Sequence, residues 1–261
     1  MHRSRKEKLR VFQACFINSI LSNCEIWGHC LPKALNTLYH KGLKICLQLR
    51  RSTPTPVIFI ESKQPSVLAI VRKRQLKFWK NLDIGHGTEL FNLVERAKDT
   101  KYIKHYTNLE KSFKDPDDAF AKINSKHYCE MWDKICSATI TQTKLKTYHA
   151  IYNNCENIPE TSLTLQTANP RHNTVLRKYV TSSHDLENEK GRWMGQSKGN
   201  RRCKQCILGL DETMLHFIFY CERFRDIRDQ YPEFPTITTL YEFFSWDKAP
   251  KVLYEMHARR K

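Results

Sequence analysis

The sequence predicts a mainly α-helical protein. Apolar residues recur at helical spacing along most of the chain, and no stretch alternates apolar and polar residues over the length of an ordinary strand. Prolines fall between the expected helices, where they end one helix or begin the next. Because 40% of the 261 residues are hydrophobic and 11% are aromatic, the chain can bury a packed core, which argues against wholesale disorder.

Two helices are expected before residue 52. The first carries four apolar residues on one face, with Cys15 beside them: Leu9, Phe12, Phe16 and Ile20. The second begins near Pro32, which suits a first helical turn, and ends at Arg50 and Arg51, where cations complement the helix dipole. Its expected stripe of apolar or small residues consists of Leu35, Leu38, Gly42, Ile45, Cys46 and Leu49.

The prolines at positions 54 and 56 exclude a continuing helix. The apolar run 57–60 is either extended or the start of a helix, and residues 67–80 predict a third helix with a basic end. Several short helices are expected within 88–154, and others near 171–180, 212–230, 238–245 and 249–258.

Three regions follow from this pattern. Residues 1–84 form a basic helical region, 85–156 a helical connecting region, and 157–261 a C-terminal region. The candidate linker is 157–170, because it holds Pro159 and Pro170 but only one charged residue, Glu160.

Positive charge is concentrated in two zones. The chain has 44 Lys and Arg against 27 Asp and Glu, a net charge of +17. Residues 1–80 carry 16 basic and 3 acidic residues, and residues 171–204 carry 9 and 3, whereas 81–160 are nearly neutral. This excess disfavours an acidic or near-neutral solution enzyme and favours a polyanionic partner. The alternative is that Lys and Arg only solvate helices.

Four residues near the C-terminus have the spacing of a metal site. Cys203 and Cys206 form a C-x2-C turn, followed by His216 and Cys221. Three thiolates and one imidazole can complete a closed tetrahedron around zinc, which predicts a structural and not a catalytic site. The alternative is chance, because ten cysteines make one C-x2-C turn unsurprising.

The spacing also predicts local structure. Asp211 is expected to cap the helix that carries His216, with Glu212 in its first turn. His216 and Cys221 are five residues apart, so the helix must distort or end before Cys221 if both are to reach one ion. The negative charge of a zinc site with three thiolates would be offset by nearby cations: Arg201, Arg202 and Lys204.

The remaining cysteines and acids suggest no further site. Most of Cys15, Cys24, Cys30 and Cys46 are expected to be buried as small apolar residues. Asp117-Asp118 is interpreted as a helix start. Gly195-Gln196-Ser197-Lys198-Gly199 is interpreted as a flexible basic loop, because no apolar strand precedes it. The group around His184, Asp185, Glu187 and Glu189 is interpreted as a solvated, capped turn, with a functional site as the alternative.

Two ordered series of residues match a known family. The first comprises Glu25-Ile26-Trp27-Gly28, Leu43-Lys44-Ile45-Cys46-Leu47, Ser52-Thr53-Pro54, Glu61, Pro65 and Lys77-Phe78-Trp79. The second comprises Lys144-Leu145, Tyr148, Arg177, Ser183-His184-Asp185-Leu186, Glu187, Glu189, Gly191-Arg192-Trp193, Arg202, the four metal ligands, Asp211-Glu212, Phe217 and Arg228. In this order they resemble the C-terminal part of non-LTR (LINE-type) retrotransposon reverse transcriptases of the jockey-like and RTE-like sort.

The resemblance implies a thumb-like helical region against a primer–template and a zinc-knuckle tail. Glu222 departs from the family, in which a proline often follows the last cysteine. The chain has no counterpart of the fingers, the palm with its catalytic aspartates, or an endonuclease domain. No catalytic residue is therefore assigned, and polymerase activity of this chain alone is not expected.

The first hypothesis is a module that binds RNA or DNA, either a primer–template or target DNA, with a palm-bearing chain as a further partner. Its candidate contacts are Arg72, Lys73, Arg74, Lys77, Lys80, Arg192, Arg201, Arg202 and Lys204. Phe78 and Trp79 stack on a base or pack in the core. The alternatives are a helical protein-interaction scaffold and an inactive retroelement remnant. No secretory signal or membrane span is expected, so the expected location is the nucleus or cytoplasm.

Overall fold

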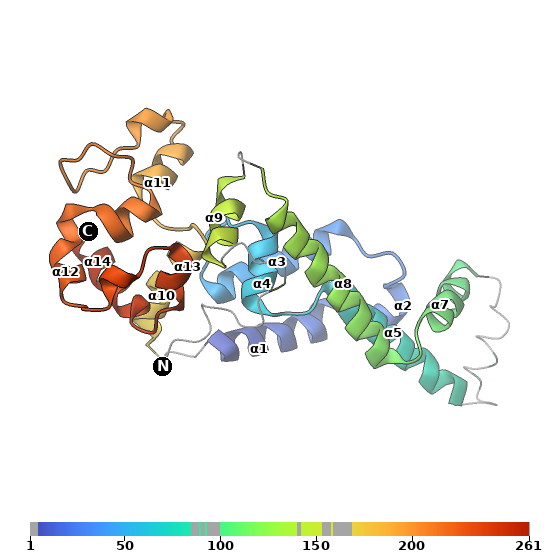
Figure 1. Cartoon of the computed structure of the whole chain (residues 1–261). Helices are drawn as coiled ribbons and strands as arrows, with labels where there is room; N and C mark the ends of the chain where they lie inside the picture. Colours follow the sequence, from blue (N-terminus) through green and yellow to red (C-terminus); the bar gives the residue numbers. More distant parts are fainter. Residues whose placement is uncertain are drawn as a thin grey trace.

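The protein is mainly α-helical in a computed structural model. The structure describes residues 5–84, 89, 92, 100–139, 142–152, 158 and 169–260. Within these residues there is no strand, and the single β-bridge joins Arg202 and Asp211. The fold class expected from the sequence is thus confirmed. The molecule is elongated, with the C-terminal helices gathered at one end and α7 at the other (Figure 1).

The N-terminal helices pack around one apolar cluster. Its elements are α1 (Arg5–Cys15), the π-helical turn η1 (Phe16–Ile20), α2 (Cys24–Trp27), α3 (Lys33–Leu47), α4 (Thr55–Ser62) and α5 (Val67–Ile84). Leu9 and Phe16 are buried in it as expected, but Ile20 is 40% exposed. The wider turn of η1 rotates the chain after Phe16, so that Ile20 leaves the face predicted by ordinary helical spacing.

The buried face of α3 differs from the expected stripe. Leu35 is buried as expected, but the other fully packed positions are Tyr39, Leu43 and Leu47, which follow at intervals of four residues. Leu38 and Ile45, expected in the stripe, are exposed. The tyrosine decides the orientation of the helix, because its ring packs between Phe12 and Phe16 of the preceding helical segment.

Gly42 allows α1 and α3 to approach closely. A Cβ atom at this position would lie 2.1 Å from the ring of Phe12. We therefore expect Gly42→Ala to destabilise the protein by about 1–3 kcal/mol, because overpacking outweighs the gain in helix propensity. Chemical denaturation measures the change. Gly199→Ala is the control, since open space surrounds Gly199, and an equal effect of both substitutions would contradict the expectation.

The central part of the molecule is built on a long helix. Helix α8 (Pro116–Cys136) packs along α4 and α5, and α7 (Lys101–Ser112) packs against α5. Asp115 caps α8 by accepting hydrogen bonds from the backbone N–H groups of Asp117 and Asp118, which confirms the interpretation of this acidic pair as a helix start. The run 57–60, which the sequence left open, lies within helix α4.

The C-terminal lobe consists of shorter elements. They are α9 (Thr143–Ile151), α10 (Pro170–Val180), α11 (Glu187–Trp193), η3 (Lys198–Asn200), η4 (His216–Tyr220), η5 (Glu222–Phe224), α12 (Arg225–Asp229), η6 (Phe234–Thr236), α13 (Leu240–Ser245) and α14 (Ala249–Arg260). Helix α14 packs against α10, α12 and α13. The helices expected near 171–180, 238–245 and 249–258 are thus present, whereas 212–230 is divided into three short pieces.

The two ends of the chain are joined through buried contacts. One apolar cluster contains Val57 and Ile60 of α4 together with residues of α9, α10 and α14. Arg177 of α10 is buried and donates a hydrogen bond to the carbonyl oxygen of Leu47, at the end of α3. The hydroxyls of Thr53 and Ser183 lie 3.0 Å apart. The expected linker 157–170 lies outside the described residues except at 158, 169 and 170.

None of the described helices combines the length and the apolar character that crossing a membrane requires.

Candidate metal centre and basic surface

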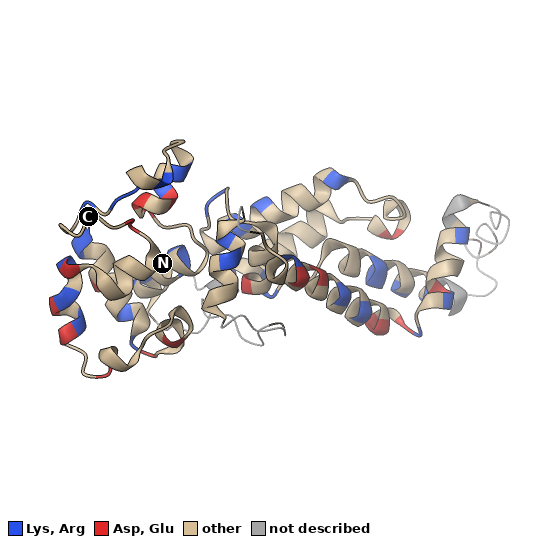
Figure 2. Ribbon diagram, turned by 45° about the horizontal axis from the view of Figure 1, so that its top comes forward, with Lys and Arg blue, Asp and Glu red and all other residues tan. Residues whose placement is uncertain are grey.

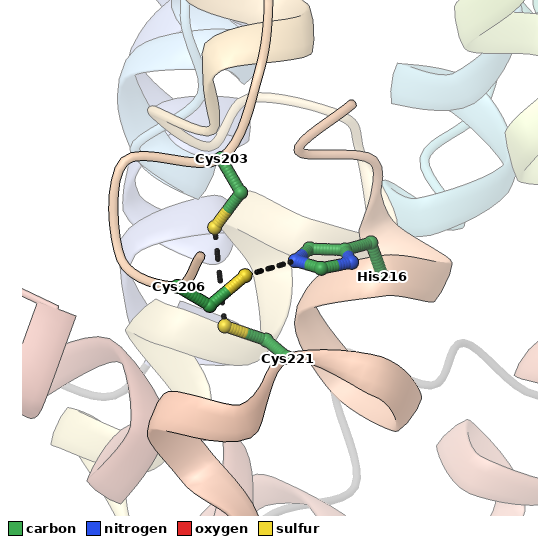
Figure 3. A group of neighbouring side chains, drawn as sticks. All are labelled: Cys203, Cys206, His216 and Cys221. Carbon is green, nitrogen blue, oxygen red and sulfur yellow. Dashed lines mark hydrogen bonds between the residues drawn. The ribbon is translucent and has the colours of Figure 1, made fainter. Parts of the chain in front are cut away.

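The structure brings together the four ligands expected from the sequence. The sulfur atoms of Cys203, Cys206 and Cys221 and a ring nitrogen of His216 all lie within 4.8 Å of one another. Figure 3 shows the three sulfur atoms and the imidazole converging on one point. Cys203, His216 and Cys221 are buried, and Cys206 is partly buried. This group can hold a metal ion.

The distances fit a tetrahedral ion. The sulfur atoms of Cys203 and Cys221 are 3.9 Å apart, and Nε2 of His216 lies 3.4 Å from the sulfur of Cys206. In a tetrahedral site with Zn–S bonds of about 2.3 Å, two sulfur atoms are separated by about 3.8 Å, and a sulfur and a nitrogen by about 3.5 Å. An ion held by all four of these ligands would have no open coordination position.

A short turn positions the first two cysteines. The backbone N–H of Cys203 donates to the carbonyl oxygen of Leu210 at 2.8 Å, and the bridge between Arg202 and Asp211 closes the same loop. The backbone N–H of Gln205 points at the sulfur of Cys203, 3.4 Å away. Such N–H groups stabilise a thiolate, so the loop is organised around the metal ligands.

The expected helix distortion between His216 and Cys221 is present. These residues bound the π-helical turn η4, in which the backbone N–H of Cys221 donates to the carbonyl oxygen of His216 at 2.7 Å. An α-helix would turn Cys221 away from His216 by about 140°, whereas a hydrogen bond from residue i+5 to residue i places the two nearly above each other.

The expected cap at Asp211 is wrong. The hydroxyl of Thr213 accepts the hydrogen bond from the backbone N–H of His216 at 3.1 Å. Asp211 instead forms the bridge with Arg202, three residues before the helical turn begins at Met214. Thr213, whose hydroxyl is nearest to the start of the turn, therefore caps it in place of Asp211.

Burial affects the protonation of the ligands. It raises the pKa of the Cys203 thiol, and it raises the pKa of the Cys221 thiol to about 12. Burial also lowers the pKa of His216, which favours the neutral imidazole that binds metals. In the absence of an ion the two thiols therefore hold their protons at neutral pH, and binding of a cation must release them.

The cations around the site are only partly those expected. Lys204 lies 3.2 Å from a carboxylate oxygen of Glu187, and the guanidinium of Arg201 donates to the backbone oxygen of Gln196. Arg202 is exposed. The cation that contacts the ligand loop is Arg228, which donates to the backbone oxygen of Cys221 at 2.9 Å. Arg228 lies seven residues after Cys221, in the separate helix α12, so the spacing of the ligands did not identify this contact.

A buried carboxylate joins the metal loop to the end of the chain. Glu212 is 1% exposed, and both of its oxygens accept hydrogen bonds from Arg260, at 2.7 and 2.8 Å. It also accepts a hydrogen bond from the backbone N–H of Glu187 at 2.7 Å. The sequence placed Glu212 at a helix start, because its partner Arg260 is 48 residues away.

Two of the expected phosphate contacts are engaged within the protein. Arg72 donates to the backbone oxygen of Gly28 and to the side chain of Gln75, and lies 2.7 Å from Nε2 of His105. Arg74 pairs with Glu25 at 2.7 Å. These arginines join α5 to α2. The sequence did not indicate this role, because no acidic residue lies near them along the chain.

The lysines of α5 differ in their surroundings. Lys73 pairs with Asp117 at 2.5 Å, whereas Lys77 and Lys80 are exposed and have no ion pair within the described residues.

Trp79 is 5% exposed and stacks on Tyr106. It therefore packs in the core, which was one of the two interpretations of this residue. Basic residues occur along the whole length of the molecule (Figure 2).

The turn at 183–189 is not solvated, contrary to expectation. His184, Glu187 and Glu189 are all buried, and the ring of His184 lies 5.0 Å from that of Tyr179. Burial lowers the pKa of His184 to about 3, so it is neutral. The acids of this turn pair with cations from near and far in the sequence. Arg192, three residues after Glu189, pairs with it at 2.6 Å, whereas Arg50, from a distant segment, pairs with Asp185.

Two further expectations concern cysteines and the glycine motif. Among the first four cysteines Cys24 is buried and Cys46 partly buried, but Cys15 and Cys30 are exposed, so the expectation of burial for most of them is wrong. They lie at the end of α1 and before α3, outside the packed faces. The motif 195–199 runs through an exposed turn into η3 and has no strand before it, as expected.

No protein-family model, no curated protein and no solved structure matches this chain.

Proposed function

We propose that the protein binds nucleic acid and that its Cys3His group holds a structural zinc ion. The observation that carries the first part is the charge of residues 1–80, in which 16 basic residues face only 3 acidic ones. The acidic residues of this region are too few to pair with most of its cations, so the surface of the helical region attracts polyanions.

The choice of zinc follows from the donor set. Three sulfurs and one imidazole nitrogen at tetrahedral separations suit zinc better than the oxygen-preferring magnesium or calcium. All four ligands are supplied by a segment of 19 residues, so the ion stabilises the local fold and does not bind a substrate.

The resemblance to the C-terminal part of non-LTR reverse transcriptases supports the same proposal. It suggests single-stranded RNA, a primer–template or target DNA as the nucleic acid. The described residues contain no carboxylate cluster suited to a polymerase metal pair, since Asp117 and Asp118 start helix α8. We assign no catalytic residue.

Binding should depend strongly on salt. The variant Lys77→Gln/Lys80→Gln should bind single-stranded RNA more weakly at every salt concentration, because two exposed cations are lost. Each lost phosphate contact should flatten the log–log salt slope by about 0.7. Fluorescence anisotropy at several salt concentrations measures both quantities.

The matched control is Lys111→Gln/Lys146→Gln, which has the same net charge but changes two exposed lysines outside α5. Equal weakening by both variants would show that α5 is not a contact surface. Wild-type protein that binds no oligonucleotide even at low salt would refute nucleic-acid binding.

The metal loop supports a second candidate, a helical protein-interaction scaffold. Its tip exposes three apolar side chains, with Ile207 at 94%, Leu210 at 51% and Leu208 at 43%. An exposed apolar group of this kind marks interaction surfaces. In that case oligonucleotides would not bind, and Ile207→Ser would reduce self-association in sedimentation experiments.

A further inference from the structure

Trp193, at the end of α11, is the most exposed tryptophan of the protein. All five tryptophans lie within the described residues. Trp79 and Trp132 are buried and the remaining two, Trp27 and Trp246, are half-buried, whereas Trp193 is 40% exposed. The adjoining Met194 is also exposed, at 66%, so an aromatic ring and an apolar side chain are both accessible to a ligand at this surface.

Two cations lie against the indole ring. The guanidinium carbon of Arg50 is 4.1 Å from the ring centroid, and Nζ of Lys144 is 5.6 Å from it. Arg50 follows helix α3, Lys144 belongs to α9 and Trp193 ends α11, so three separate segments converge here. These distances are within the range of cation–π contacts.

The cations of this surface outnumber its acids. Glu189, whose pKa is raised by burial, is surrounded by four cations, which act in the opposite direction: Arg192, Lys144, Arg201 and Arg50. Asp185 is the other acid of the group and pairs with Arg50. After both acids are neutralised, positive charge remains beside the ring. Arg50 and Arg192 keep about a third of their side-chain surface exposed, at 35% and 30%.

We propose that Trp193 stacks on an unpaired base of a single-stranded polynucleotide whose backbone phosphates contact Arg50 and Arg192. This inference rests on the proposed nucleic-acid binding. It adds where the nucleic acid binds, at Trp193, and that the bound form is single-stranded. Stacking on an aromatic ring needs a free base face, which a duplex does not offer along its length. The surplus of cations over acids on this surface favours a polyanionic ligand over an apolar protein segment, which would bring no negative charge to it.

The test is oligonucleotide binding by three variants. Trp193→Ala should weaken binding of oligo(U) and oligo(dT) roughly 5- to 150-fold, the range observed when a stacking aromatic is removed. Trp193→Phe keeps an aromatic ring and should restore most of the affinity. The control is Tyr241→Ala on α13, which removes an equally exposed aromatic side chain and should bind like wild type. Unchanged melting temperatures and metal content show that the variants are folded.

An abasic strand of the same length separates stacking from charge. It carries the same phosphates but no bases, so Trp193→Ala and wild type should bind it equally. Equal weakening on the abasic strand, or no weakening on oligo(U) and oligo(dT), would overturn the stacking role of Trp193 while leaving nucleic-acid binding intact. Comparison of oligo(U) with oligo(dT) identifies RNA or DNA as the preferred source. A wild-type protein that binds neither refutes both proposals.

Discussion

Cys203→Ser should abolish metal binding and unfold the segment from Cys203 to Cys221. Wild-type protein purified without added metal should contain one equivalent of zinc, because four ligands at tetrahedral separations bind tightly. Structural zinc sites in zinc-finger peptides contribute on the order of 10 kcal/mol, so loss of one ligand should remove most of the local stability. Elemental analysis and thermal unfolding measure the two effects.

The matched control is Cys129→Ser, which replaces an exposed cysteine on α8 and should leave zinc and stability unchanged. The buried environment adds a second readout, because the protonated thiols of Cys203 and Cys221 must release protons when the ion binds. Zinc titration of metal-free protein in a weak buffer should therefore acidify the solution. Metal-free protein with an unchanged melting curve would exclude a structural zinc ion.

The second large effect is expected at the buried pair of Glu212 and Arg260. Glu212→Gln keeps the shape of the side chain but removes its charge, so the guanidinium of Arg260, whose side chain is 15% exposed, loses its counterion. Breaking a buried pair on one side costs about 3–5 kcal/mol. The pair joins the metal loop to α14, so both should loosen together.

Hydrogen exchange and chemical denaturation can follow this loss. Glu222→Gln is the control, because Glu222 is exposed and has no ion pair within the described residues, and it should change stability by less than about 0.5 kcal/mol. If Glu212→Gln were as harmless as the control, Arg260 would contribute little to the C-terminal lobe.

The sequence predicted those features that depend on near neighbours. The spacing of the cysteines and the histidine identified all four residues of the group that can hold a metal ion. The five-residue gap between His216 and Cys221 required the distorted turn that η4 supplies. The helix start at the acidic pair after Pro116 and the helix over residues 67–80, which lies within α5, likewise followed from local sequence patterns.

Features that depend on distant partners could not be predicted. Arg72 and Arg74 were expected to contact phosphates, because the acceptors that join them to α2 are distant in sequence. Gly28 lies 44 residues from Arg72, and Glu25 lies 49 residues from Arg74. The turn at His184 was expected to be solvated, and Glu212 was expected in a first helical turn. Their partners Arg50 and Arg260 come from other parts of the chain. On α3, helical periodicity alone allowed two faces, and the packing of Tyr39 between Phe12 and Phe16 selects one of them.

The contact between Arg177 and the end of α3 has a consequence for synthesis of the chain. The carbonyl oxygen of Leu47 receives its hydrogen bond only from a residue that leaves the ribosome 130 positions later. The hydroxyl of Thr53 likewise can contact the hydroxyl of Ser183 only after that later residue has been synthesised. Contacts of such long sequence separation slow folding. The N-terminal helices therefore emerge first, but they complete these contacts only after the C-terminal lobe has been synthesised.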